Sequence, residues 1–187
     1  MVGYIQYVLV NTIRHLGGDV ALNAVAARLG LAQLPEFRID SDYDNAQCLA
    51  MIEATGAHFG LDRPALFRLY ADQFIIASRR QFPFFYDMAE SAEDFLRRQP
   101  RIHKTLASSI QDKGTRERVT QKFELLEGSI PMRVRYYSPN KLCGLYEALF
   151  YRLLDEYGQS GHLSHDRCQH RGDSYCEFSL YFSGESP

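Results

Sequence analysis

The strongest constraint on the fold of this chain is a change in the spacing of its apolar residues near position 120. Before that point they recur every three or four residues, the spacing of one face of an α-helix. Two later segments, 123–136 and 175–182, instead alternate apolar and polar residues as strands do. A helical segment, 142–157, separates them. This order predicts an α+β fold in which a helical N-terminal region packs on a small antiparallel C-terminal sheet with an inserted helix.

Turn and capping residues set the expected limits of the N-terminal helices. Glycine commonly follows the last turn of a helix, and aspartate followed by proline commonly begins one. The sequence therefore predicts helices over 5–16, 20–29, 46–59 and 62–80. Phe82-Pro83 should break the last of these, because proline lacks the amide hydrogen that a helix interior uses.

Similar signals divide the remainder of the chain. Pro100 is expected to separate a short helix, 92–98, from a second helix that ends at Gly114. The Glu127-Gly128 pair predicts the turn of a β-hairpin, and the last strand is expected over 175–182.

Length and charge bound the class of protein. A chain of 187 residues can bury one substantial core, so we expect a single domain over 1–187. Within it, a helical subregion should span about 1–62, and the sheet with its associated helices about 63–187. With 21 Lys+Arg against 23 Asp+Glu, the net charge of -2 offers no long-range attraction to nucleic acid or to an anionic membrane.

The expected location is the cytoplasm. No segment approaches the length and apolarity of a membrane span, and the first residues lack the basic flank and cleavage site of a secretory signal. Four cysteines in such a chain are expected to be thiols or metal ligands before disulfides, since the cytosol keeps thiols reduced.

Three of these cysteines have the spacing of a metal site. His165 and Cys168 would come from a tight loop, Cys176 from the adjoining strand and Cys143 from the start of a helix. Three thiolates and one imidazole are a common tetrahedral zinc set, and such sites contribute folding free energy directly. Spacing alone leaves open that the thiols are merely small buried residues, and His170 competes with His165 as the nitrogen ligand.

His103 lies on the apolar side of its predicted helix, with Leu106 and Ile110. A histidine so placed is usually a satisfied core residue. Its functional interpretation is an axial ligand to haem iron, because neutral imidazole suits that metal and an aromatic-rich helical region supplies the dry walls that a porphyrin needs.

Tyr136, Ser138 and Asn140 form a row of polar side chains at alternate positions. Alternate residues of an extended chain project to the same side, so the two hydroxyls can meet one carboxylate, such as a porphyrin propionate. Alone, this row is equally typical of a solvated strand end. Only its combination with His103 favours a ligand site.

Five segments carry a resemblance to a known family. They are Met1-Val2-Gly3-Tyr4-Ile5, the helix with Tyr70-Ala71-Asp72-Gln73-Phe74 leading to Phe82-Pro83, Ile102-His103, Arg135-Tyr136-Tyr137-Ser138-Pro139, and Ser164-His165-Asp166-Arg167-Cys168-Gln169-His170. Over nearly its whole length the chain resembles the haem-nitric oxide/oxygen binding (H-NOX) domains, bacterial relatives of the haem domain of soluble guanylate cyclase. The metal set, with Cys143 and Cys176, resembles the zinc-bearing subset of that family.

The resemblance implies roles for particular residues. His103 falls on the proximal ligand of haem b, and Tyr136 and Ser138 fall on the first two members of a Tyr-x-Ser-x-Arg propionate signature. Ile5 falls on a residue that packs on the porphyrin and distorts it. The set Cys143, His165, Cys168 and Cys176 is implied to hold Zn²⁺.

The resemblance also implies a gas preference. Leu145 stands at the position of the tyrosine found in oxygen-binding members, and Leu9 and Phe74 fill the other distal positions. A pocket wall without a hydrogen-bond donor does not stabilise the charge that develops on bound dioxygen. Nitric oxide, and carbon monoxide with it, are therefore the expected ligands, and dioxygen is not.

The chain departs from the family at Asn140, where the signature has arginine. A neutral amide in place of a charged fork should weaken propionate anchoring by about 1–2 kcal/mol, the gap between charge-assisted and neutral hydrogen bonds. Arg135 and Lys141 lie nearby, but each is one residue out of phase and should point to the other side of the extended chain.

The leading hypothesis is a cytoplasmic haem-based nitric oxide sensor that is not an enzyme. By resemblance, release of His103 would change a surface read by a histidine kinase or a cyclic-di-GMP enzyme. The alternative is a haem-free or weakly haem-binding, zinc-stapled signalling module whose cysteines sense oxidants. An enzyme acting on a flat apolar ligand is the weakest reading, because the sequence offers no paired carboxylates, activated nucleophile or phosphate loop.

Overall fold

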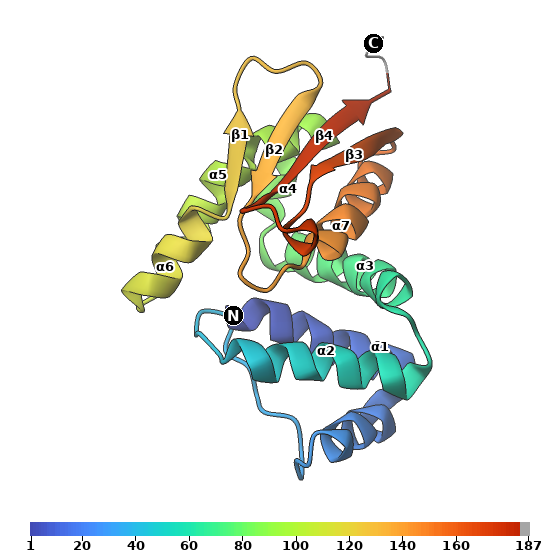
Figure 1. Cartoon of the computed structure of the whole chain (residues 1–187). Helices are drawn as coiled ribbons and strands as arrows, with labels where there is room; N and C mark the ends of the chain where they lie inside the picture. The colour runs from blue at the N-terminus through green and yellow to red at the C-terminus, as the bar shows by residue number, and fades with distance from the viewer. Residues whose placement is uncertain (184–187) are drawn as a thin grey trace.

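The computed structural model describes residues 1–183 and has the expected α+β architecture. In chain order its elements are α1 (Gly3–Arg28), α2 (Asn45–Phe59), α3 (Arg63–Gln81), α4 (Pro83–Asp87), α5 (Ala92–Ala107), α6 (Lys113–Thr120), β1 (Phe123–Leu126), β2 (Met132–Tyr136), α7 (Cys143–Glu156), β3 (Gly161–Arg167), a short 3-10 turn (Gln169–Arg171) and β4 (Cys176–Phe182). Figure 1 shows α1 and α2 below the sheet, with α3 between. Within the described part of the chain, no helix has the length and apolarity needed to cross a membrane.

The sheet has the strand order β1-β2-β4-β3, and every neighbouring pair is antiparallel. Tyr136 at the end of β2 lies opposite Phe123 of β1 on one side and Cys176 of β4 on the other. Helices α5 and α7 contact the sheet through β1 and β3 and lie behind it in Figure 1. One sheet face is therefore covered by helices.

Two clusters of buried apolar side chains hold the fold together. One joins the inner face of the sheet to α7 and to parts of α3, α4 and α5, and the other joins α1, α2 and α3 to the start of α7. Phe74 of α3 and Leu149 of α7 pack against both clusters. Helices α3 and α7, which also contact each other, thus connect the two parts.

The expected break at Pro100 is wrong. Helix α5 runs through that proline, which forfeits one backbone hydrogen bond. The rest of the helix is well supported, since Ser91 accepts a hydrogen bond from the Asp94 amide and Arg97 pairs with Glu93 one turn earlier. Nor does Gly114 end this helix. It lies in α6, a separate helix that the sequence pattern does not predict.

Strand β3 was also missed, and the loop expected around His165 is part of it. The strand forms an edge of the sheet and its residues are exposed or half-buried, so it lacks the apolar alternation that marks the other strands. At Gly17-Gly18, in contrast, the expected interruption is present, because both residues have non-helical backbone angles within α1.

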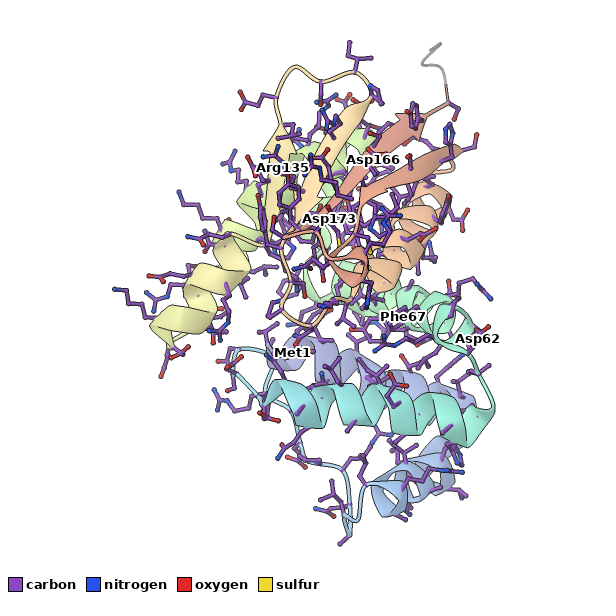
Figure 2. All side chains as sticks on the ribbon, viewed as in Figure 1. Met1, Asp62, Phe67, Arg135, Asp166 and Asp173 are labelled. Atoms are coloured by element: carbon purple, nitrogen blue, oxygen red, sulfur yellow. The ribbon has the colours of Figure 1, made fainter. Side chains whose placement is uncertain are left out.

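An ion-pair cluster covers the outer face of the sheet. Glu177 of β4 is 2% exposed and accepts hydrogen bonds from Arg133 and Arg135 of β2, the latter at 2.9 Å. Arg135, labelled in Figure 2, also pairs with Glu124, which is 47% exposed. Although burial raises the pKa of Glu177, the two guanidinium groups outweigh it and hold that pKa below its usual range.

Replacing Glu177 with Gln should lower the free energy of unfolding by about 2 kcal/mol, because it leaves two guanidinium groups without their buried partner. This figure is below the full effect of breaking a buried pair, since both arginines are partly exposed. The matched variant Glu124→Gln should change stability by less than about 0.5 kcal/mol. Urea denaturation of the two variants measures the difference, and equal losses would contradict the assignment.

Candidate ligand cavity and metal centre

A cavity of about 400 Å³ lies among α1, α3, α5, α7 and the adjoining ends of β1 and β2. That volume is within the range of small-molecule pockets, and the wall is mostly aliphatic and aromatic. The structure brings five of the predicted ligand-site residues to this wall: Ile5, Phe74, His103, Tyr136 and Leu145. Leu9 is 1% exposed but belongs to the core between α1, α2 and α3, and it does not line the cavity.

His103 faces this cavity from α5. Its ring packs edge-on against Phe123, with 4.7 Å between the ring centroids, and its Nδ1 is buried without a hydrogen-bond partner in residues 1–183. Burial, reinforced by the nearby Lys122 charge, lowers the pKa of His103 to about 3. The imidazole is therefore neutral at physiological pH, the form in which it can donate a lone pair to a metal.

Buried polar atoms without partners gather at this cavity. Within residues 1–183 there are six such side-chain atoms, and four belong to residues of the cavity wall: Tyr4 Oη, Gln99 Oε1, His103 Nδ1 and Tyr146 Oη. Native proteins pair nearly all buried polar atoms, so a concentration of unpaired ones indicates a ligand site.

The alternate-residue row does not converge as predicted. Tyr136 lines the cavity, and Ser138 is buried beside it and accepts a hydrogen bond from the Asn140 amide at 3.3 Å. The Asn140 side chain instead donates to Asn45 Oδ1 at the start of α2, at 3.3 Å, and is not part of the wall. Asn140 therefore joins the loop before α7 to α2.

The two neighbouring cations behave as the alternation predicted. Arg135 is occupied on the outer face of the sheet by Glu177 and Glu124. The Lys141 side chain is exposed and does not line the cavity. Neither residue replaces the missing arginine.

Sequence reasoning missed Lys122, the one lysine or arginine on the cavity wall as described for residues 1–183. It lies directly before β1, and its Nζ is 5.8 Å from the centroid of the Tyr136 ring. Burial lowers the pKa of its ammonium group to about 8. The only signal in the sequence is a lysine next to the first apolar residue of a strand, which is usually a solvated position.

The expectation of a wall without hydrogen-bond donors is also wrong. The three positions on which it rested are apolar, but Tyr4, Ser78 and Tyr86 also line the cavity, and the Tyr4 ring packs edge-on against Phe74 with 5.5 Å between the ring centroids. Ser78 Oγ lies 2.5 Å from Tyr86 Oη and 2.7 Å from the Phe74 carbonyl oxygen. Ser78 and Tyr86 are therefore satisfied within the wall, whereas the Tyr4 hydroxyl is not.

The four predicted metal ligands come together. The ligand atoms of Cys143, His165, Cys168 and Cys176 all lie within 4.8 Å of one another, so the cluster could hold a metal ion. The sulfurs of Cys143 and Cys168 are 3.9 Å apart, close to the edge of about 3.8 Å that two zinc–thiolate bonds of about 2.3 Å give in a tetrahedron.

The cluster depends on three different elements. Cys143 begins α7, Cys176 begins β4, and a register shift after His165 ends the regular pairing of β3 just before Cys168. The His165 ring stacks on Phe178 with centroids 4.4 Å apart, and its buried Nε2 has no partner within residues 1–183. His170 is placed elsewhere, with its Nε2 2.8 Å from the Lys141 carbonyl oxygen. The geometry thus selects His165 over His170 as a member of the cluster.

Electrostatics at the cluster favour a bound cation. Burial and the neighbouring thiols raise the pKa of Cys143 to about 12, and burial raises that of Cys176. Burial lowers the pKa of His165 and so favours its neutral, metal-binding form. A bound dication would offset the cost that burial imposes on the thiolate forms of Cys143 and Cys176.

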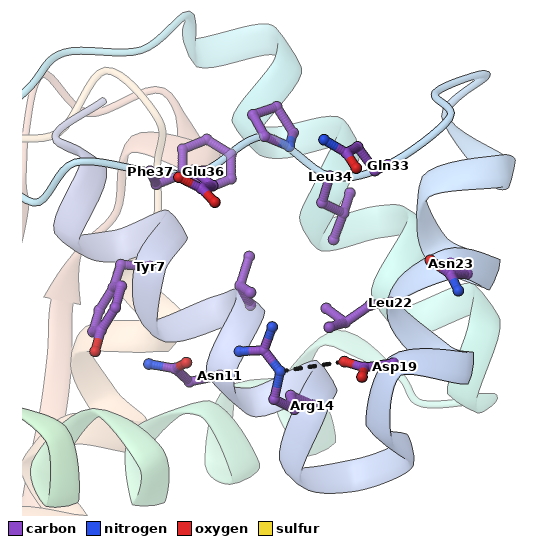
Figure 3. Close-up of a pocket in the computed structure, with 12 residues that line it drawn as sticks. Tyr7, Asn11, Arg14, Asp19, Leu22, Asn23, Gln33, Leu34, Glu36 and Phe37 are labelled. Carbon is purple, nitrogen blue, oxygen red and sulfur yellow. Dashed lines mark hydrogen bonds and ion pairs between the residues drawn. The ribbon is translucent and has the colours of Figure 1, made fainter.

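A second hollow, of about 460 Å³, lies between the two halves of α1 and residues 33–37 (Figure 3). Its wall carries polar side chains, among them the exposed Arg14–Asp19 pair with a 3.5 Å contact. None of the unpaired buried polar atoms found in residues 1–183 belongs to it. Although slightly larger, this hollow lacks the unpaired buried polar atoms of the first cavity, the one lined by His103 and Tyr136, which is called the aromatic cavity below.

Comparison with known proteins gives one family. A family model described as haem-NO-binding matches residues 2–165, most of the chain. No curated protein matches the sequence significantly.

Solved structures share the fold. An H-NOX protein from S. oneidensis in its Fe(II)NO state superposes with a TM-score of 0.81 at 15% identity, covering 98% of this chain and 100% of its own. An oxygen-binding H-NOX domain related to soluble guanylate cyclases superposes with a TM-score of 0.76 at 14% identity, covering 100% of this chain and 99% of its own.

Metal removal tests the cysteine and histidine cluster. The purified protein is expected to contain one zinc ion per chain, and Cys176→Ala should abolish that content and lower stability by about 3 kcal/mol or more, or the Tm by about 10 °C. Cys48→Ala is the matched control, because Cys48 is buried in α2 outside the cluster. Elemental analysis and thermal unfolding measure both. Equal zinc content in the two variants would overturn the assignment.

Proposed function

The chain belongs to the haem-NO-binding family, and we propose that it binds haem b in the aromatic cavity and acts as a sensor of nitric oxide. The observation that carries the proposal is the neutral, half-buried His103 on the cavity wall, with an unpaired Nδ1 and a flat aromatic surface beside it. Haem, when bound, supplies an iron atom that takes a diatomic gas as ligand.

The residues of the cavity have distinct proposed tasks. His103 would be the protein ligand to iron, and Ile5 would pack against the porphyrin. The hydroxyls of Tyr136 and Ser138 would meet a propionate, and the Asn140 side chain would not, because it is bonded to Asn45. The unpaired hydroxyls and amide oxygen on the wall would find partners on the ligand or on water that accompanies it.

The proposed gas preference is for nitric oxide, and carbon monoxide with it, over dioxygen. Leu145 and Phe74 present only carbon to the cavity, and Leu9 lies behind the wall. The Ser78 and Tyr86 hydroxyls are engaged with each other and with a backbone carbonyl, so they have little capacity left for a gas ligand. Tyr4 is the residue of this group whose hydroxyl remains free.

Signal output would start at α5. This helix carries His103 and contacts α6, β1, α4 and α7, so release of His103 would allow α5 to move relative to the sheet. We propose that a partner, a histidine kinase or a cyclic-di-GMP enzyme, reads this change, and that the chain itself acts in the cytoplasm as a regulator without catalysis. The net charge of -2 supports a protein partner over a nucleic acid.

The metal cluster is proposed to be a structural zinc site that staples α7, β3 and β4 into one unit with the cavity. It also supports a second candidate function, a zinc-stapled redox sensor, because the sulfurs of Cys143 and Cys168 are close enough for oxidation to couple them. Zinc without iron in protein expressed with a haem supply would favour this second function. On either reading, residues 1–187 would act as one domain with helical (1–62) and sheet-containing (63–187) subregions.

Replacement of His103 tests the haem proposal. The wild-type protein expressed with a haem supply should show a strong Soret band with about one haem per chain, and His103→Ala should lose it. Outer-shell partners alone are worth about 10–100-fold in metal affinity, so loss of the ligand should exceed about 100-fold. Added imidazole should restore the band in His103→Gly, and the exposed His15→Ala is the control. A wild-type protein that takes up no haem would defeat the proposal.

Gas selectivity is tested on the reduced, haem-loaded protein. Nitric oxide and carbon monoxide should shift the Soret band, whereas air-equilibrated buffer should leave no dioxygen spectrum, because the side chains of Leu145, Phe74 and Leu9 carry no hydrogen-bond donor. Tyr4→Phe should leave these spectra unchanged. A stable dioxygen spectrum that disappears in Tyr4→Phe would contradict the proposed selectivity and identify the Tyr4 hydroxyl as a donor to the gas.

A further inference from the structure

We propose that Lys122 is the cationic anchor for a carboxylate of the ligand that the aromatic cavity holds. The inference rests on the proposed function, and it identifies the ligand class more closely: a flat, apolar molecule that carries a carboxylate at its edge, as a porphyrin does. Lys122 would thus bind the ligand carboxylate, which the Asn140 side chain does not reach because it is bonded to Asn45.

The backbone of Lys122 is fixed where the cavity needs a charge. Its carbonyl oxygen accepts a hydrogen bond from the Tyr137 amide at 2.9 Å, which extends the β1–β2 pairing by one step beyond Phe123 and Tyr136. The chain bends at this residue between α6 and β1, so strand alternation does not set the side-chain direction. The side chain lines the cavity and places its ammonium group over the Tyr136 ring.

No carboxylate of residues 1–183 compensates this charge, since none lies within 4 Å of Lys122 Nζ. Among the described residues, the one carboxylate on the cavity wall belongs to Asp40, and Arg38 already binds it through Nε at 3.3 Å and a terminal nitrogen at 3.2 Å. The face of the Tyr136 ring gives Lys122 only a weak substitute for an anion.

An unpaired ammonium group in an apolar wall destabilises the ligand-free protein. The same desolvation lowers the pKa of the Lys122 ammonium group to about 8. At pH 7 this group is still protonated in most molecules. A ligand carboxylate at the cavity edge would relieve that penalty and form a charge-assisted contact in a medium of low dielectric. Lys122 should therefore lower the stability of the ligand-free protein and raise the stability of the ligand-bound protein.

Position also favours one carboxylate shared by Lys122 and Tyr136. Both residues line the cavity, and the Lys122 ammonium group lies 5.8 Å from the centroid of the Tyr136 ring, so one carboxylate at this part of the wall could reach both. The other basic residues of the neighbouring segment are committed elsewhere, Arg135 to the outer face of the sheet and Lys141 to the surface.

Haem and haem dimethyl ester, in which both propionates are methylated, separate carboxylate recognition from binding of the porphyrin plane. Wild type should hold haem more tightly than the ester, and Lys122→Met should lose about 10–100-fold in haem affinity, the range of one charged contact, with a much smaller loss for the ester. Lys122→Arg should keep the preference. Lys104→Met, which removes an exposed charge from the same helix as His103, should also keep it.

Thermal unfolding of the haem-free proteins gives an independent readout. Lys122→Met should unfold at a higher temperature than wild type, while the increase that haem adds should be smaller; Lys104→Met should change neither. Wild type that binds both porphyrins, with an unchanged haem-to-ester preference in Lys122→Met, would overturn this inference and leave the haem proposal standing. Wild type that binds neither porphyrin would overturn both.

Discussion

The register of β2 between β1 and β4 positions both the cavity wall and the metal cluster. Because Tyr136 lies opposite Phe123, the aromatic wall forms beside His103, and because it lies opposite Cys176, the metal cluster begins at the next strand. A slip of one residue would turn every side chain of β2 to the other face and separate both sites. The eight residues from Tyr136 to Cys143 therefore serve two sites at once.

Buried polar atoms without hydrogen-bond partners concentrate in two regions of the interior. Five of the six unpaired buried polar atoms within residues 1–183 belong to the cavity wall or to His165 in the metal cluster. Each such atom costs on the order of 1–3 kcal/mol when nothing binds it. A bound ligand would also add packing contacts to the aromatic rings of the cavity wall. Ligand and metal are thus expected to contribute directly to the free energy of unfolding, and the domain should be markedly less stable without them.

Much of the fold and of both sites could be predicted from the sequence, because apolar spacing and Cys/His spacing are local signals. They placed the helical half, the hairpin, the helix after Cys143 and all four members of the metal cluster. The failures have physical causes: a helix can absorb one lost hydrogen bond at Pro100, and an edge strand such as β3 needs no apolar pattern. Asn140 and Lys122 could not be placed because a turn and a bend, which alternation does not describe, set their side-chain directions.

On the proposed function, the His103 imidazole would hold haem iron in this cavity and would be released when nitric oxide binds. Resonance Raman spectroscopy of the ferrous, haem-loaded protein shows whether this bond forms, with histidine labelled by nitrogen-15 to identify the iron–histidine stretching band. The protein without a gas ligand should show a label-sensitive band that is absent from His103→Gly restored with unlabelled imidazole and that disappears when nitric oxide is added. A protein without that band, or one in which the band persists unchanged under nitric oxide, would contradict the proposed function.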